Sequence, residues 1–361
     1  MKKMIKLFDT IIDKQEEIEL VKTLRSHFWA SGSGSGNVKK FEEKFQQYVH
    51  SDACIAVNSG TAALNLALSL FDIKNKEVII PSLSFVSTAH AVVENGGIPK
   101  FVDVDSDTLC IDPNEIKKSI TKKTAAIIPV HFGGNPCDLT QINQIAKKNN
   151  LIIVEDAAHA AGTIYKNKKI GSHSAAICFS FHPVKNLAMP TGGLISINHS
   201  QAKKYSKILL SKRWCGITNR TDTTYDVKEL GWNYYMNELS AAIGLVQLKK
   251  LDYMNKRRKI IAKKYDEGIH LENKSIFNKD SSFHLYWIMV KNRNKFMKNM
   301  LDHGVETGIH YRPIHTMSMY KQKLSLPITE KAGQNIVSIP IHPNLTNLET
   351  EKIINLINKF T

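Results

Sequence analysis

The stretch Leu151-Ile152-Ile153-Val154-Glu155-Asp156-Ala157-Ala158-His159-Ala160 predicts a buried strand followed by a turn or a helix. The strand would deliver Asp156 to its carboxyl end, where parallel sheets bind their ligands. A carboxylate at that edge could hold a positively charged ring nitrogen, or it could cap the next helix. His159 follows three residues later, so one helical face could carry both side chains. It could touch a cofactor or be a packed histidine.

On both sides of this stretch, short β-branched apolar runs alternate with helical patterns. The alternation predicts an α/β fold in three αβα layers, with a mainly parallel sheet between helices. Strands are expected at residues 78–80, 100–104, 125–130, 151–154, 176–180 and 194–197. Helices are expected at residues 14–28 and 38–49, and helical or turn-helix connections at residues 58–70, 90–95, 114–119, 139–148 and 157–161.

The pattern changes from about Met236 onward. We therefore predict two domains. Residues 1–245 form a large ligand-binding domain with an N-terminal helical segment, and residues 246–361 form a smaller C-terminal α+β domain. The elements expected in this part are a long amphipathic helix at 238–264, a strand at 285–290, and helices at 295–303 and 348–359.

The composition is that of a soluble globular protein, with 42% hydrophobic and 23% charged residues among 361. No apolar run could span a bilayer, and no signal core follows the basic N-terminus, so we expect a cytoplasmic protein without membrane contact. The cysteines are odd in number and lack C-x-x-C spacing, which favours reduced thiols over a disulfide framework or a metal site. They are Cys54, Cys110, Cys137, Cys178 and Cys215.

The formal net charge is +16, with a pI near 9.4. A lysine-rich solvated surface explains this charge, and attraction of anionic ligands such as a cofactor phosphate or a nucleotide diphosphate is the functional alternative. Nucleic-acid binding is a third interpretation. The lysines are spread along the chain, and no zinc-finger or RNP-type pattern is present, so we expect no nucleic-acid partner.

A phosphate site is predicted at Val57-Asn58-Ser59-Gly60-Thr61-Ala62-Ala63-Leu64. Small hydroxyl residues precede an Ala- and Leu-rich helix, whose unpaired N–H groups and dipole favour a bound phosphate. Gly60 would let the backbone approach the ligand closely. A plain Ser or Thr N-cap is the alternative.

A candidate nucleophile lies in Phe179-Ser180-Phe181-His182-Pro183-Val184-Lys185-Asn186-Leu187. The strand ends at Ser180, a candidate phosphate donor, and the turn at Pro183 presents Lys185. Partial burial beside aromatic side chains would lower the lysine pKa and favour imine formation, whereas a surface turn lysine is the alternative. Phe85 follows another strand and could stack on a ring or be part of the core. All these groups lie at one edge of the predicted sheet.

Together these segments resemble the DegT/StrS family of sugar aminotransferases, which are fold type I enzymes that depend on pyridoxal 5'-phosphate (PLP). The resemblance covers nearly the whole chain. Besides the segments above, it is carried by Val38-Lys39-Lys40-Phe41-Glu42, residues 81–88, Gly231-Trp232-Asn233-Tyr234, His310-Tyr311-Arg312-Pro313-Ile314-His315 and Ile339-Pro340-Ile341-His342-Pro343.

The resemblance implies a role for each matching residue. Lys185 would hold PLP as an internal aldimine, and Asp156 would pair with the pyridine nitrogen. Phe85 would stack on the ring, and His159 would lie near its phenolic oxygen. The phosphate would be bound by Gly60, Thr61, Ala62 and Ser180, and the sugar would lie near His310, Tyr311 and His315.

The implied activity is transfer of an amino group from an amino acid to a keto-sugar. L-Glutamate is the expected donor, and a nucleotide-linked keto-deoxysugar is the expected acceptor, in polysaccharide, glycan or antibiotic sugar biosynthesis. Asn233 would reach the cofactor phosphate of the neighbouring subunit, which implies a homodimer with shared active sites.

Two positions depart from the family pattern. Thr191 stands where an acidic residue usually precedes Gly-Gly, and Tyr235 stands where an arginine usually helps to bind substrate. Two alternatives share the scaffold. A PLP-type sugar dehydratase carries histidine in place of the lysine, which Lys185 argues against. A non-enzymatic regulator would lack the intact lysine, aspartate and serine set.

Overall fold

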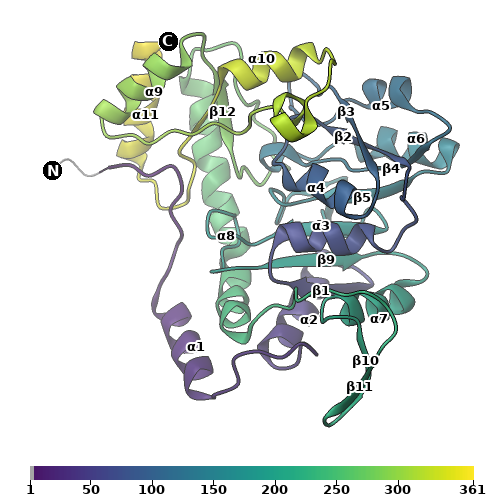
Figure 1. The fold of residues 1–361 in the computed structure, drawn as a ribbon. Helices are drawn as coiled ribbons and strands as arrows, with labels where there is room; N and C mark the ends of the chain where they lie inside the picture. The colour runs from purple at the N-terminus through teal and green to yellow at the C-terminus, as the bar shows by residue number, and fades with distance from the viewer. Residues whose placement is uncertain (1–3) are drawn as a thin grey trace.

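A seven-stranded sheet forms the centre of the computed structural model, which describes residues 4–361 (Figure 1). The strand order is β1-β9-β8-β5-β4-β2-β3, and β9 alone runs antiparallel to its two neighbours in this sheet. The other pairings are parallel. The strands are β1 (Ala53–Val57), β2 (Glu77–Pro81), β3 (Ile98–Val102), β4 (Thr124–Ile127), β5 (Ile152–Asp156), β8 (Ala176–Ser180) and β9 (Gly193–Ile197).

Helices cover both faces of this sheet. Successive strand residues point to opposite faces, so Ile79 and Ile127 join one core while Val78 and Ile80 join the other. The three-layer αβα prediction is therefore confirmed. The first core is covered by α2 (Asn37–Val49), α5 (Pro113–Ser119) and α6 (Leu139–Asn149), and the second by α3 (Gly60–Leu68), α4 (Ser87–Glu94) and α7 (Ala202–Lys212).

The long helix α8 (Glu238–Gly268) runs without a break past the domain boundary expected at residues 245 and 246. The residues after the expected boundary, including the second half of α8, form a core of their own that contains Ile261, Tyr286 and Val337. Ile5 also belongs to this core, so the start of the described chain packs on the C-terminal part. The other elements there are β12 (Tyr286–Met289), β13 (Ile336–Ile339), α9 (Arg293–Asp302), α10 (Pro327–Asn335) and α11 (Asn347–Phe360).

The N-terminal helix α1 (Lys14–Arg25) begins at a capping box formed by Asp13 and Glu16, and it packs against α8 (Figure 1). The amide of Gln247 donates to Glu16 Oε1 over 2.7 Å, which fixes this contact. A two-stranded hairpin extends outward from the region of α7 (Figure 1). Its strands are β10 (Ile217–Thr221) and β11 (Thr224–Val227), and the remaining short elements are β6 (Ile164–Tyr165), β7 (Lys168–Lys169), η1 (Phe132–Gly134), η2 (Ile314–Thr316) and η3 (Ser318–Tyr320).

Some expectations on local structure need correction. Strand β1 was absent from the prediction because Ala-Cys-Ile-Ala-Val carries two alanines and lacks a clear β-branched run. Residues 157–161 form consecutive turns and not a helix, so Asp156 and His159 do not share a helical face. Both side chains nevertheless reach the same cavity.

No helix within residues 4–361 combines the length and apolar character needed to cross a bilayer. All five cysteines are free thiols, and four of them are buried, the exception being Cys215. The described residues contain no group of three or more His, Cys, Asp or Glu side chains placed to hold a metal ion.

Candidate active site

A cavity of about 380 Å³, which we call the main cavity, lies at the carboxyl edge of the large sheet. This volume is typical of a pocket for a small molecule. The parallel strands β1, β2, β5 and β8 end at this edge, so the residues that follow them meet there although they are far apart in sequence. Predicted site residues that line it are Gly60, Thr61, Phe85, Asp156, His159, Ser180, Lys185, His310 and Tyr311.

The start of α3 forms one end of the main cavity. Ser59 is the N-cap, and its hydroxyl oxygen accepts a hydrogen bond from the backbone N–H of Ala62 over 3.1 Å. A Cβ on Gly60 would lie 2.7 Å from Ser180 Cβ, so glycine is needed where the helix start approaches the end of β8. Free N–H groups of the first turn, the helix dipole and the Ser180 hydroxyl together suit an anion such as a phosphate.

Asp156 ends β5 and is 4% exposed. The Thr88 hydroxyl donates to Asp156 Oδ2 over 2.9 Å, and the Ala158 N–H donates to Oδ1 over 3.1 Å. Burial raises the pKa of this carboxyl, against the opposing effects of these two hydrogen bonds and of Lys185. A buried carboxylate of this kind favours a ligand group that brings a proton and a positive charge.

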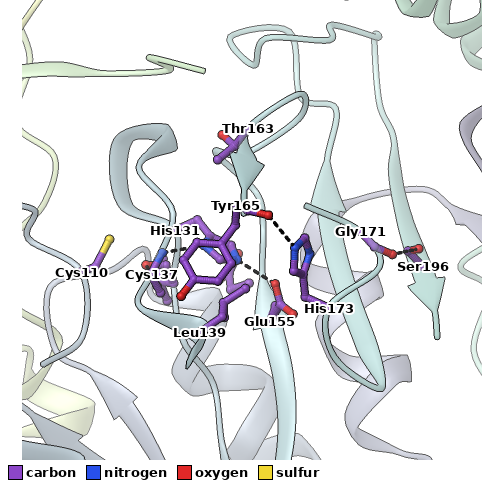
Figure 2. Close-up of polar contacts among 12 residues, drawn as sticks. Cys110, His131, Cys137, Leu139, Glu155, Thr163, Tyr165, Gly171, His173 and Ser196 are labelled. Carbon is purple, nitrogen blue, oxygen red and sulfur yellow. Dashed lines mark hydrogen bonds and ion pairs between the residues drawn. The ribbon is translucent and has the colours of Figure 1, made fainter. Parts of the chain in front are cut away.

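A buried pair behind β5 holds this strand end in place (Figure 2). The backbone N–H of Cys137 donates to His131 Nδ1 over 3.1 Å, so in the neutral ring Nε2 carries the proton. His131 Nε2 then donates to Glu155 Oε2 over 2.8 Å. The backbone N–H of His131 also donates to the carbonyl of Asp156, which ties the loop to the residue that faces the cavity.

Lys185 lies on a turn after β8, closed by its backbone N–H to the carbonyl of His182. Burial lowers the pKa of Lys185 to about 8, while the nearby charge of Asp156 opposes this shift. Lys185 Nζ lies 3.5 Å from Nε2 of His284. Close to neutral pH, part of this lysine population is therefore an uncharged amine able to act as a nucleophile.

Aromatic side chains line another part of the main cavity. The Gly133 N–H donates to His159 Nδ1 over 3.2 Å, so Nε2 of the neutral ring can donate to the Tyr311 hydroxyl 3.1 Å away. Burial holds the pKa of His159 well below its usual value, which keeps this ring neutral. Phe85 is 56% exposed although it is apolar, and its ring lies 6.0 Å from that of Tyr311. An exposed aromatic at a cavity suits stacking on a ligand ring.

Three predicted residues do not line the main cavity. Ala62 is buried within α3, Asn233 is exposed, and His315 is buried with Nδ1 2.6 Å from the Ser82 hydroxyl. Of the two departures from the family pattern, Thr191 lines the cavity and is exposed. Tyr235 does not line it, and its backbone forms an isolated β-bridge with Val57. The side chain at 191 thus offers a neutral hydroxyl to the cavity.

His284 was missed in the sequence. It is 3% exposed, stacks on Phe8 with ring centroids 5.8 Å apart, and lies 4.4 Å from the ring of His159. It precedes β12 in a run of ordinary core residues, so no local pattern distinguishes it. Only the packing of distant segments reveals its contact with Lys185.

A family model described as the DegT/DnrJ/EryC1/StrS aminotransferase family matches residues 10–358. The chain belongs to this family. It is 34% identical to "Uncharacterized protein MJ1066" of Methanocaldococcus jannaschii, covering 98% of this chain and 96% of that protein. Among solved structures it resembles Spr1654 of Streptococcus pneumoniae in its pyridoxamine phosphate (PMP) form, with 27% identity, 99% and 97% coverage and a TM-score of 0.93. It also resembles the sugar aminotransferase CalS13 of Micromonospora echinospora, with 28% identity, 99% and 100% coverage and a TM-score of 0.91.

Membership in the DegT/DnrJ/EryC1/StrS family confirms the predicted fold type I architecture and the prediction of a PLP-dependent sugar aminotransferase enzyme. Spr1654 has been solved in both PLP and PMP forms. The residues of this chain fit PLP on independent grounds. An amine with a pKa of about 8, a buried carboxylate and a helix start that lies close to Ser180 at Gly60 surround one cavity.

Proposed function

We propose that this protein transfers the amino group of an amino acid, with L-glutamate as the expected donor, to a keto-sugar that is linked to a nucleotide. The observation that carries this proposal is the arrangement of Lys185 and Asp156 in one cavity beside the start of α3. The family resemblance supports the sugar acceptor, and the formal net charge of +16 favours anionic substrates such as nucleotide diphosphates.

Bound PLP supplies an aldehyde that links to amines and a ring that delocalises negative charge from the adjoining carbon. Lys185 Nζ would attach to this aldehyde and, once displaced by the donor, would accept a proton from the donor's α-carbon. Asp156 would keep the ring nitrogen protonated. The Thr88 and Ala158 hydrogen bonds orient the carboxylate for that task.

The remaining contacts position the cofactor. The N–H groups of Gly60 and Thr61 and the Ser180 hydroxyl would bind the phosphate, and Phe85 would cover one face of the ring. His159, kept neutral by burial, would lie near the phenolic oxygen. His310 and Tyr311 would face the sugar, since both line the same cavity.

We further propose that the active form is a homodimer in which Asn233 binds the cofactor phosphate of the neighbouring subunit. Asn233 is exposed and outside its own main cavity, which suits a contact in trans. Large apolar side chains are exposed around the β10–β11 hairpin, including Tyr225, Val227 and Leu230. Sedimentation equilibrium tests the dimer, and an Asn233→Ala variant that keeps full PLP affinity would contradict the shared site.

Two measurements test the proposed reaction. Addition of L-glutamate to the PLP-loaded protein should shift the visible absorbance as the cofactor takes up the amino group. Mass spectrometry of a panel of keto-sugar nucleotides should then find a product with an amine in place of the keto oxygen. A protein that binds no PLP and aminates no member of the panel contradicts the proposal.

A further inference from the structure

A second, very small cavity lies behind Lys185, and we call it the rear cavity. Its volume is about 10 Å³, which admits one group the size of a water molecule or a carboxylate oxygen. Val184 and Lys185 line both cavities, so the rear cavity adjoins the place where the chemistry occurs. The rear cavity is lined by Phe8, Asp9, Thr10, Pro183, Val184, Lys185, Arg258, His284, Ile341 and His342.

Arg258 lines the rear cavity as a buried charge without a partner. It lies on α8 and is 6% exposed, and its Nη1 has no hydrogen-bond acceptor. Within residues 4–361 its guanidinium forms no ion pair with a carboxylate, and burial lowers its pKa to about 9. The adjacent Arg257 differs, because it donates to the Leu345 carbonyl and to Asn347. A buried guanidinium without a partner lowers the stability of the fold, so its presence here points to an anion from outside the chain.

The other polar groups of the rear cavity leave the positive charge uncompensated. Asp9 lines it, but its carboxylate accepts from the Asn344 amide over 2.8 Å and lies beyond ion-pair distance of Arg258. His342 Nε2 lies 3.1 Å from the Lys6 carbonyl and donates to it, while Nδ1 is buried without a partner. Burial and the nearby charge of Lys185 hold the pKa of His284 well below its usual value, so this ring is neutral. A single small anion would match this set.

The chemistry of the neighbouring lysine identifies that anion. The amino nitrogen of a donor must take the place of Lys185 Nζ, because it forms a bond to the same carbon of the cofactor. The donor's carboxylate is attached to the carbon next to that nitrogen, so it must lie close to the position of Nζ. The rear cavity adjoins that position and offers a guanidinium whose Nη1 has no acceptor, and a charged N–H donor of this kind suits a carboxylate oxygen.

We propose that Arg258 binds the α-carboxylate of the amino-acid donor and so makes the enzyme select amino acids over simple amines. This inference rests on the proposed function for the identity of the donor. The bulk of the donor would lie in the main cavity, and one oxygen of its carboxylate would enter the rear cavity, where Nη1 of Arg258 lacks an acceptor. Arg258 would act as a specificity residue for the first half of the reaction, independent of the sugar.

The test compares L-glutamate with 4-aminobutyrate, which is glutamate without its α-carboxylate. The PLP-loaded wild-type protein and the variants Arg258→Met, Arg258→Lys and Lys256→Met are mixed with each amine, and the absorbance change is followed. Lys256→Met is the matched control, since it removes one exposed charge from the same helix. Calorimetry with unreactive glutarate gives a binding constant, and the melting temperature is measured with and without glutarate.

We expect Arg258→Met to lower the kcat/KM for L-glutamate by roughly 10- to 100-fold, the usual weight of a charge-assisted pair. The rate with 4-aminobutyrate should stay unchanged, and Arg258→Lys should be intermediate because it keeps the charge but places it on a differently shaped group. Glutarate should raise the melting temperature of the wild type and of Lys256→Met, but not that of Arg258→Met. Without ligand, Arg258→Met should melt no lower than the wild type, because the lost charge has no internal partner.

Equal loss with both amines, or unchanged glutarate affinity in Arg258→Met, would overturn the proposal. A ligand-free melting temperature well below the wild type would also overturn it, since that result means an internal partner for Arg258. These outcomes are separate from the proposed function. If the wild type transaminates and Arg258→Met keeps the same kcat/KM for L-glutamate, only the role of Arg258 is contradicted. If the wild type reacts with no donor, the proposed function is contradicted, and glutarate binding still tests the role of Arg258.

Discussion

The main cavity and the rear cavity meet at Lys185 but are built in different ways. Most of the wall of the main cavity is made of short segments at the ends of strands, and its polar groups have hydrogen-bond partners or face the cavity. The wall of the rear cavity joins Phe8, Arg258 and His342, which belong to three separate parts of the chain, and it carries a charge without a partner. The first wall suits a resident cofactor, and the second suits a ligand that comes and goes.

The largest effect should come from Lys185→Ala, because this residue serves both cavities. The variant loses the amine that accepts a proton, and proton transfer of this kind contributes roughly 10²- to 10⁴-fold in rate. Turnover with L-glutamate and a keto-sugar should fall at least that far. Steady-state assays measure the loss, and Lys185→Arg serves as control because it keeps the charge but not the reactive amine. Sustained turnover by Lys185→Ala would refute its assigned role.

The contrast between the two cavities also sets how much the sequence could predict. Asp156, Ser180 and Lys185 were found because each ends a strand or lies in the turn after one, and parallel strands bring such ends to one edge. Arg258 was not predicted as a site residue, although the long helix that carries it was expected at 238–264. Its position beside Lys185 is formed only when the segments around Phe8 and His342 pack there, and no local sequence pattern predicts this packing.

The same limit applies to the fold. The strands of the sheet and the helix α8 could be predicted from apolar periodicity, whereas β1 could not, because it contains two alanines and its side chains are buried by helices that pack on both faces of the sheet. The turns at 157–161 replaced an expected helix or turn-helix because the backbone there bonds to the ends of neighbouring strands. The N–H of Ala157, for example, donates to the carbonyl of Cys178. Tertiary hydrogen bonds decided these places, and sequence periodicity does not report them.

Asp156→Asn should show the next largest effect and should act on the main cavity alone. The amide can still accept from the Thr88 hydroxyl, but it cannot pair as an anion with a protonated ring nitrogen. The loss of a charge-assisted hydrogen bond, about 1.5–3 kcal/mol, predicts a fall in turnover on the order of 10- to 100-fold. Glutarate affinity should be unchanged, since Arg258 lies in the rear cavity. A matching loss of glutarate binding would show that the two cavities are not independent.

Gly60→Ala should weaken PLP binding without altering donor choice. The added Cβ would lie 2.7 Å from Ser180 Cβ, so the start of α3 must shift away from the end of β8. Such overpacking costs about 1–3 kcal/mol, and a tenfold weaker PLP affinity is the central expectation. Gly97→Ala is the matched control, because its Cβ would lie 2.9 Å from Val92 Cγ1 but far from the cavity. That control should lose stability and keep its PLP affinity, as measured by equilibrium dialysis.

The smallest expected effect is a pH dependence of PLP uptake that reports the protonation of Lys185. Because burial lowers its pKa to about 8, the neutral fraction rises about tenfold between pH 7 and pH 9. The rate at which the cofactor-free protein takes up PLP should rise by the same factor, as followed by visible absorbance. The cofactor-free protein should also gain stability from about pH 8 towards the ordinary lysine pKa near 10.4, because the unfolded chain holds the proton more strongly in that range.

Asp156→Asn makes this pH profile decisive. The carboxylate charge favours the protonated lysine, so its removal should move the midpoint of PLP uptake to lower pH. His310, whose pKa burial lowers to about 4, does not titrate in this window and cannot produce the same profile. A midpoint that stays fixed in Asp156→Asn would mean that the group whose titration controls PLP uptake is not Lys185.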